Sequence, residues 1–90
     1  MKQMESAGRL LDENYPRQAI EILDRIIAAD SDNADALFLR GKAFWRLGMR
    51  DRATADYSAA AHLKPAGPAA RALENARDIA DFFNPDIFNP

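Results

Sequence analysis

Two residue types that favour β-strands, Val and Thr, are almost missing from this chain, and its composition favours a helical fold. No Val occurs among its 90 residues and Thr54 is the only Thr, whereas Ala occurs 18 times and Leu 8 times. β-Branched side chains pack well on pleated sheets, while Ala and Leu lose little conformational freedom in a helix. We therefore expect an all-α protein whose alanine-rich helices pack closely together.

Composition also excludes several kinds of functional site. The chain has no Cys and a single His, His62, which rules out disulfides, cysteine-based zinc sites and multi-histidine metal centres. No apolar run approaches the roughly 20 residues of a membrane helix, and the first residues lack the apolar core of a signal peptide. The net charge of −2 gives no global attraction to nucleic acid. We expect a soluble, cytoplasmic protein that needs no cofactor and binds neither nucleic acid nor a membrane.

Apolar residues recur at helical spacing in five stretches, and turns rich in Pro, Gly, Asn and Asp separate them. The pattern predicts helices over about 2–13, 16–29, 34–47, 51–64 and 68–83. Gly48 is placed to end the third helix as a left-handed C-terminal cap. The short connections make consecutive helices antiparallel.

Residues of the same kind also recur 34 positions apart. The clearest pairs are Leu10 with Phe44, Ala19 with Ala53, and Leu23 with Tyr57. A fixed period that holds two antiparallel helices is typical of units that stack on one another. We therefore expect repeat one over about 1–33, repeat two over about 34–67, a capping helix over about 68–83 and an apolar tail over 84–90.

The second copy carries the more regular pattern, which reads Leu37-x2-Arg40-Gly41-x2-Phe44, then Ala53-x3-Tyr57, then Pro65. This pattern resembles the tetratricopeptide repeat, in which a large apolar residue, Leu-Gly, an aromatic residue, Ala, a second aromatic residue and Pro stand at those spacings. The resemblance covers about 1–67 and implies antiparallel helix-turn-helix repeats stacked as a right-handed α–α superhelix, with the fifth helix as a cap.

The chain departs from this family pattern at several positions. The first copy has Gln3, Ser6 and Ala7 where a bulky residue, Leu and Gly are usual, and in the second copy Arg40 stands in place of Leu. The first copy is therefore supported mainly by the period.

The matched residues also have a physical reason to be there. Gly41 and Ala53 are small, which suits a point where the two helices of one unit cross. Phe44 and Tyr57 are large, which suits the wedge between one helical pair and the next. Pro65 ends the fourth helix without competing for a backbone hydrogen bond.

The resemblance implies a function as well, because such repeats bind extended peptides or partner helices on the concave face that the first helix of each pair lines. The implied positions on this face are Met4, Gly8, Leu11 and Asp12 in repeat one, Asp35, Phe38, Lys42, Trp45 and Arg46 in repeat two, and Leu73 and Arg77 in the capping helix. Aromatic and arginine residues dominate binding energy at interfaces. We expect a non-catalytic module for a peptide or partner helix. The alternative left open is that Phe38 and Trp45 pack on neighbouring helices and the cations are merely solvated.

Two narrower binding functions have less support. Family members that grip a C-terminal carboxylate use Lys and Asn residues at positions that are occupied here by Met4, Gly8, Leu39, Ala70 and Glu74. That clamp is not expected. The five cations between Arg40 and Arg52 form a local basic stretch, which fits either an acidic partner or an ordinary solvated surface.

Catalysis finds little support in the sequence. Ser58 and His62 are i, i+4 neighbours, but no carboxylate at a helical spacing orients the imidazole. We expect this pair to be solvated and the protein not to be an enzyme.

The C-terminal residues are unusually apolar for a tail. Phe83, Ile87 and Phe88 would be costly to leave in water, at about 25 cal/mol per Å² of apolar surface. One interpretation is that they fold back to cover the last helix. The other is that they dock on a second copy, which would make the chain a self-associating structural or scaffold protein.

Overall fold

The computed structural model describes residues 2–82, and the side chains of residues 2–77. This part of the chain forms five helices and contains no strand: α1 (Lys2–Asp12), α2 (Pro16–Ala29), α3 (Ala34–Arg46), α4 (Arg50–Leu63) and α5 (Pro68–Phe82). The all-α fold expected from the composition is confirmed. α2 has the expected bounds, and the other helices begin or end within one residue of them.

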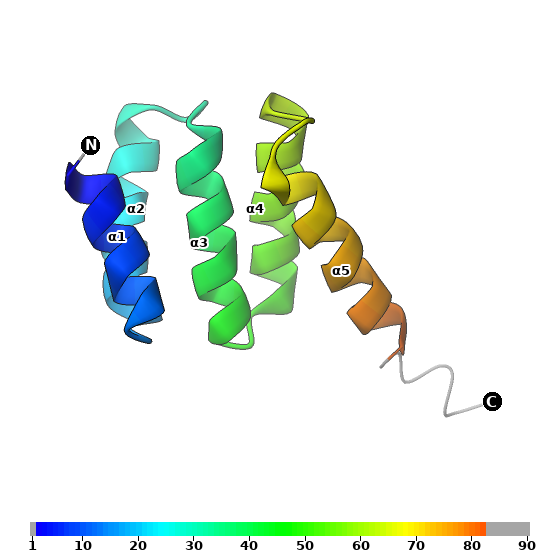
Figure 1. Cartoon of the computed structure of the whole chain (residues 1–90). Coiled ribbons are helices and arrows are strands. Elements are labelled where there is room, and N and C mark those ends of the chain that lie inside the picture. Colours follow the sequence, from blue (N-terminus) through cyan, green and yellow to red (C-terminus); the bar gives the residue numbers. More distant parts are fainter. Residues whose placement is uncertain (1, 83–90) are drawn as a thin grey trace.

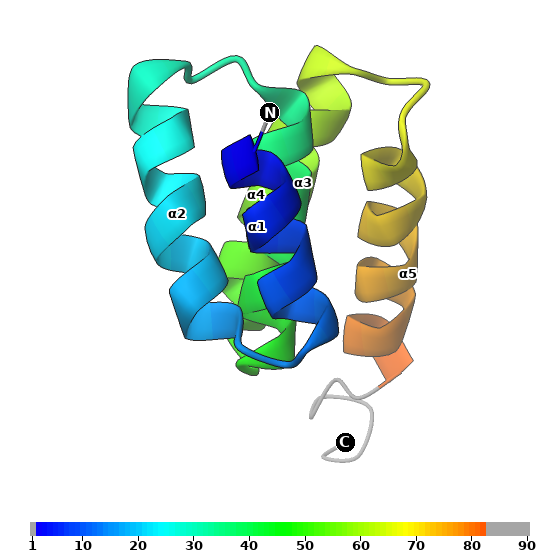
Figure 2. The same cartoon turned by 60° about the vertical axis from the view of Figure 1, so that its left-hand side comes forward.

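The helices form two layers (Figure 1). α1, α3 and α5 lie in one layer, with α2 and α4 behind them, and consecutive helices run antiparallel. Figure 1 shows the pair α1–α2 at one end of the molecule and α5 at the other, and in Figure 2 α1 lies in front of α3 and α4, between α2 and α5. Residues 34 and 68, where the 34-residue period starts anew, are the first residues of α3 and α5. The fold is therefore built from repeated helix-turn-helix units.

The turns that follow α1 and α3 are built in the same way. Asn14 and Gly48, 34 positions apart, both have a left-handed backbone, with φ of 67° and 76°. The closing hydrogen bonds run from Tyr15 N–H to Leu10 O (2.7 Å) and from Met49 N–H to Phe44 O (2.9 Å). This is the Schellman arrangement, which satisfies carbonyls at a helix end. The cap expected at Gly48 is confirmed, and Asn14 has the same role in repeat one because Asn tolerates this conformation better than most residues.

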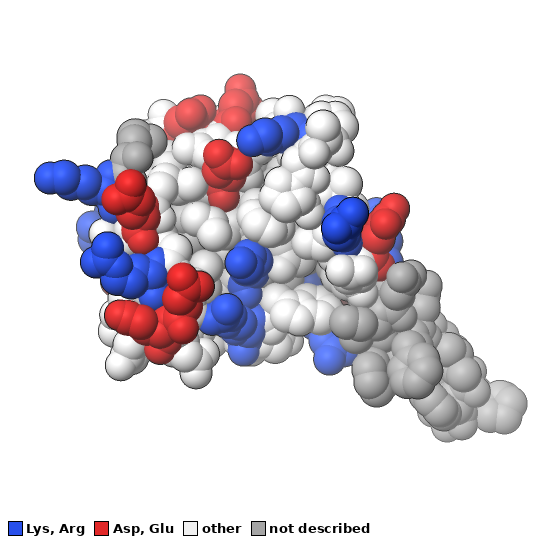
Figure 3. Space-filling view, in the orientation of Figure 1, with Lys and Arg blue, Asp and Glu red and all other residues white. Residues whose placement is uncertain are grey.

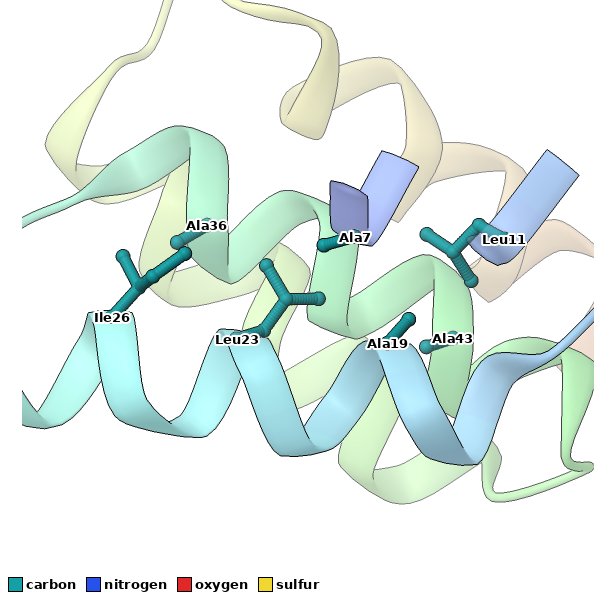
Figure 4. Packing of buried hydrophobic residues seen from close by; sticks show 7 residues of the cluster. All are labelled: Ala7, Leu11, Ala19, Leu23, Ile26, Ala36 and Ala43. Carbon is teal, nitrogen blue, oxygen red and sulfur yellow. The ribbon is translucent and has the colours of Figure 1, made fainter. Parts of the chain in front are cut away.

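An alanine-rich cluster holds α1, α2 and α3 together (Figure 4). It consists of Ala7, Leu11, Ala19, Leu23, Ile26, Ala36 and Ala43, and the four alanines have no exposed surface. Leu11, expected on the open concave face, is only 1% exposed because it lies against Ala19 and Ala43. The small side chains bring the helices close enough to enclose Leu11 and Leu23, the two largest fully buried side chains.

The crossing of α3 and α4 depends on a glycine. A Cβ atom placed on Gly41 would lie 2.7 Å from two ring carbons of Tyr57, well inside van der Waals contact. Ala53, on the facing side of α4, is fully buried. The prediction that these two small residues lie at a helix crossing is thus confirmed, and the ring that requires the space is that of Tyr57.

The two large aromatic residues connect repeat two to the helix that follows it. Phe44 and Tyr57 form one buried cluster with Ala53 and with Ala76 of α5. They therefore fill the wedge between the second helical pair and α5, as expected from their size.

Candidate interaction surface

Trp45 lies in the last turn of α3 and packs half-buried against the cluster of Phe44, Tyr57 and Ala76. It is neither a core residue nor a freely solvated one. Its indole forms part of the walls of two neighbouring hollows between α5 and the α3–α4 pair. The last turn of α3 thus carries an aromatic side chain that its neighbours hold in place but do not cover.

The smaller hollow, of about 180 Å³, is lined by Trp45, Tyr57, Ala72, Asn75 and Ala76. The larger hollow, of about 410 Å³, is lined by Trp45, Leu73, Ala76 and Arg77 together with the α4 residues Arg50, Asp51, Thr54, Ala55 and Ser58. Trp45 and Ala76 belong to the walls of both hollows, so the two hollows are neighbours. We call the residues Trp45, Ala72, Leu73, Ala76 and Arg77 the Trp45 surface.

Cations lie over the aromatic rings near this surface. The guanidinium carbon of Arg50 is 5.4 Å from the Trp45 ring centroid, and Lys42 Nζ is 5.6 Å from the Phe38 centroid. Phe38 also packs on Tyr57, with centroids 5.8 Å apart. Such contacts contribute about 0.5–1 kcal/mol each at exposed sites and hold the rings in one orientation.

The remaining candidate residues lie in different surroundings. Asp35, at the opposite end of α3, forms an exposed ion pair with Lys64 (3.5 Å), which contributes little to stability. Arg46 donates a hydrogen bond to the backbone oxygen of Leu11 at the end of α1. The structure therefore brings Trp45, Leu73 and Arg77 together around one hollow, and places Asp35 and Arg46 towards other neighbours.

An ion-pair network that the sequence did not lead us to expect links three helices. Arg40 Nε and Nη2 donate to the two carboxylate oxygens of Asp56 (2.8 and 2.9 Å), and Nη1 donates to Asp24 (3.1 Å). Asp56 is the one buried charged residue among those described, and Asp24 is exposed. Two features of the sequence could have indicated this network. Arg40 stands where Leu is usual, and each acid lies 16 positions from Arg40.

Two pKa shifts follow from this packing. The hydrogen bonds with Asp56 raise the pKa of Arg40 above its ordinary value, although partial burial acts in the opposite direction. Burial raises the pKa of the Tyr57 phenol; Arg46 opposes this shift and Asp56 adds to it. Arg40 thus remains charged inside the repeat, and Tyr57 remains neutral.

The five cations of the basic stretch from Arg40 to Arg52 contact different groups. Arg40 is paired with acids, Arg46 with a backbone oxygen, Lys42 lies over Phe38 and Arg50 over Trp45. The guanidinium of Arg52 lies 5.8 Å from the ring centroid of Phe44. Figure 3 accordingly shows Lys and Arg groups over α3, with uncharged surface between them and the charged groups over α5. The cations of this stretch therefore lie apart from one another and do not form one basic patch.

The other features of the sequence add no second site. Ser58 and His62 are both exposed, and neither side chain makes a hydrogen bond to a residue whose side chain is described. Within the same part of the chain, no three His, Cys, Asp or Glu residues form a metal-binding group, and no helix is long and apolar enough to cross a membrane. Phe83, Ile87 and Phe88, the candidates for self-association or capping, lie outside the described residues.

No protein-family model matches the chain, and no curated protein matches it either. Among solved structures, it is similar to the solution NMR structure of the Bacteroides fragilis protein BF1650. The two sequences are 28% identical, the alignment covers 99% of this chain and 91% of that one, and the TM-score is 0.86. A protein whose structure was determined experimentally therefore shares this helical arrangement.

Proposed function

We propose that the chain is a non-catalytic interaction module of the tetratricopeptide-repeat type, which binds a segment of another protein at the Trp45 surface. The observation that carries this proposal is the half-buried Trp45, which lines two hollows, the larger of them together with Leu73 and Arg77. Tryptophan and arginine are the residue types most enriched at the energetic centres of interfaces.

The surroundings of Trp45 make it suitable as a binding anchor. Packing against Tyr57 and Ala76 and the guanidinium of Arg50 above the ring fix the indole before any partner arrives. Ordering a side chain on binding costs about 0.5–1.5 kcal/mol, so a side chain that is already ordered favours association. The larger hollow, of about 410 Å³, has room for a side chain of a partner but not for a folded domain. A peptide or a single helix is therefore the expected partner.

A selection from a random peptide library tests the proposal without any assumption about the partner. The full chain is immobilised, and the same selection is run with Arg77→Glu and with Arg71→Glu. Arg71 is an exposed cation on the same helix that lines neither hollow, so this variant controls for the change of charge.

We expect the wild-type chain and Arg71→Glu to enrich a shared peptide motif that Arg77→Glu fails to enrich. Binding of a selected peptide should also change the emission of Trp45, the single tryptophan of the chain. Enrichment of no motif by the wild-type chain, or of the same motif by both variants, would show that the Trp45 surface is not a binding site.

A further inference from the structure

The larger hollow beside Trp45 is lined by both apolar and cationic side chains. Trp45, Leu73 and Ala76 are apolar, Arg50 and Arg77 are cations, and the uncharged polar residues Thr54 and Ser58 also line it. Asp51 is the one acid among its lining residues. Arg77 is exposed and makes no ion pair with any residue whose side chain is described. The hollow therefore favours a ligand that is apolar at its centre and negatively charged around it.

From this chemistry, we infer that the partner is an acidic segment carrying one aromatic side chain, whose ring enters the larger hollow between Trp45 and Arg77. The inference rests on the proposed function and deepens it, because it names the class of partner for the same surface. The carboxylates of the segment lie near Arg77 and near Lys42, which stands one turn before Trp45 on α3.

The molecule already uses the interaction that this mode of binding requires. Lys42, Arg50 and Arg52 each lie over an aromatic ring at 5.4 to 5.8 Å from the ring centroid. Arg77 borders a hollow in which the Trp45 indole is the one aromatic ring among the lining residues whose side chains are described. An incoming ring would stack near the indole and place its face or edge within reach of the guanidinium, which adds a cation–π contact to the apolar burial.

Other ligand compositions fit the surface less well. A purely apolar segment would cover the guanidinium of Arg77 without giving it a partner, and a charge that is desolvated without a partner costs free energy. A basic segment would meet the cations Arg50 and Arg77 that line the hollow and be repelled. An acidic segment without an aromatic residue would leave the apolar residues that line the hollow in contact with water.

Three synthetic peptides test the inference directly. The first has one phenylalanine with two aspartates on each side, the second has alanine in place of the phenylalanine, and the third has lysines in place of the aspartates. Each peptide is titrated into the full chain, and binding is followed through the NMR shifts of the Trp45 indole N–H and the backbone amides of residues 72–77. The titrations are repeated with Arg77→Glu and with Arg71→Glu.

We expect the first peptide to bind, the alanine peptide to bind about tenfold more weakly, and the lysine peptide to bind more weakly still. Arg77→Glu should weaken the first peptide about tenfold, whereas Arg71→Glu should change its affinity by less than about twofold. Added salt should weaken the first peptide, because exposed charges are screened.

The inference is wrong if the lysine peptide binds as well as the first, if both variants weaken binding equally, or if no peptide shifts the Trp45 resonance at millimolar concentration. These outcomes are distinct from a failure of the proposed function. A library selection that enriches a motif of another composition, dependent on Arg77, would leave the proposed function standing and overturn only the partner class.

Discussion

Leu11 and Trp45 stand 34 positions apart, at equivalent places in the two repeats, but only Leu11 is enclosed. Leu11 is 1% exposed because α3 follows directly against it and belongs to a complete helical pair. Trp45 is followed by α5, a helix for which the described chain contains no second helix to complete a pair, and two hollows remain beside it. The same repeat position is therefore a core site inside the stack and a candidate binding site at its end.

The repeats also distribute volume differently at the crossing of their two helices. Repeat one places Ala7 and Leu23 there, and repeat two places Gly41 and Tyr57 at the equivalent positions. A methyl group on the first helix is exchanged for a larger ring on the second. The crossing therefore constrains the sum of the two side chains and not either residue alone.

A third difference concerns charge. Arg40 and Asp56 of repeat two correspond to Ser6 and Ile22 of repeat one, so only the second repeat contains a buried ion pair. Asp24, from repeat one, joins this pair from outside. The network thus holds α3 against α4 and also connects the second repeat to α2 of the first.

The largest expected difference in stability is between the alanine variants of Leu11 and Trp45. Leu11→Ala removes an enclosed side chain and is expected to lower the free energy of unfolding by about 3 kcal/mol. Trp45→Ala removes a larger side chain but should cost less than about 2 kcal/mol, since the indole already borders two hollows. Urea unfolding, followed by circular dichroism, measures both. An equal or larger loss for Trp45→Ala would show that this wedge is as closed as that of Leu11.

The second effect tests the ion network. Asp56→Ala leaves the Arg40 guanidinium partly buried without its bidentate partner, and should cost about 2 kcal/mol. Asp24→Ala removes the exposed acid of the same network and should cost less than about 1 kcal/mol. The comparison is made by urea unfolding at neutral pH, and similar losses in the two variants would contradict the difference in burial between the two acids.

The third prediction tests the exchange of side-chain volume at the helix crossing. It compares two glycine-to-alanine variants that should change stability in opposite directions. Gly41→Ala should destabilise the protein by about 1–3 kcal/mol, because its Cβ would meet the Tyr57 ring at 2.7 Å. Gly8→Ala in α1 meets no atom within 4 Å and should stabilise by about 0.5–1 kcal/mol, the usual helix preference of Ala over Gly.

The double variant Gly41→Ala with Tyr57→Leu recreates the pair of repeat one. It should recover part of the loss of Gly41→Ala relative to the sum of the two single changes. If the free-energy changes of the two single variants simply add up in the double variant, the two positions are not coupled and the volume exchange is contradicted.

The smallest expected effect is a dependence of the free energy of unfolding on alkaline pH, which should arise from Tyr57 in repeat two. Burial raises the pKa of Tyr57 in the folded chain, so folding holds the phenolic proton more tightly than the unfolded chain does. This contribution is fully present below the unfolded tyrosine pKa of about 10 and is lost as the pH rises through the higher folded value. Tyr57→Phe should therefore lose less stability than the wild-type chain above pH 10, as measured by urea unfolding. The same alkaline loss in both proteins would assign it to other groups.

The fold was predictable from the sequence because local signals agreed along the chain. Turn residues, apolar spacing and the cap at Gly48 all indicated the helices that the structure contains. The matching turn at Asn14 was missed because Pro16 is by itself a sufficient reason for α1 to end. The 34-residue period pointed to the crossing at Gly41 and Ala53, because closely packed helices require small residues where they cross.

The candidate site could be predicted from the sequence only in part. Helical spacing put Phe38, Lys42, Trp45 and Arg46 on one face, but it does not reveal which neighbour each side chain meets. Arg46 reaches α1 and Arg50 covers Trp45, contacts that depend on the turns and on how helices pack. The Arg40–Asp56 pair was missed because a charged residue in a helical pattern is ordinarily solvated.

Acrylamide quenching of tryptophan emission tests the difference between Leu11 and Trp45 most directly. Trp45 is the single tryptophan, so the emission of the full chain reports on this position alone. We predict an emission maximum between those of a buried and a fully solvated indole, with ready quenching by acrylamide in the native protein. Blue-shifted emission that acrylamide leaves unchanged would mean that Trp45 is enclosed like Leu11, and would contradict the difference between the two positions.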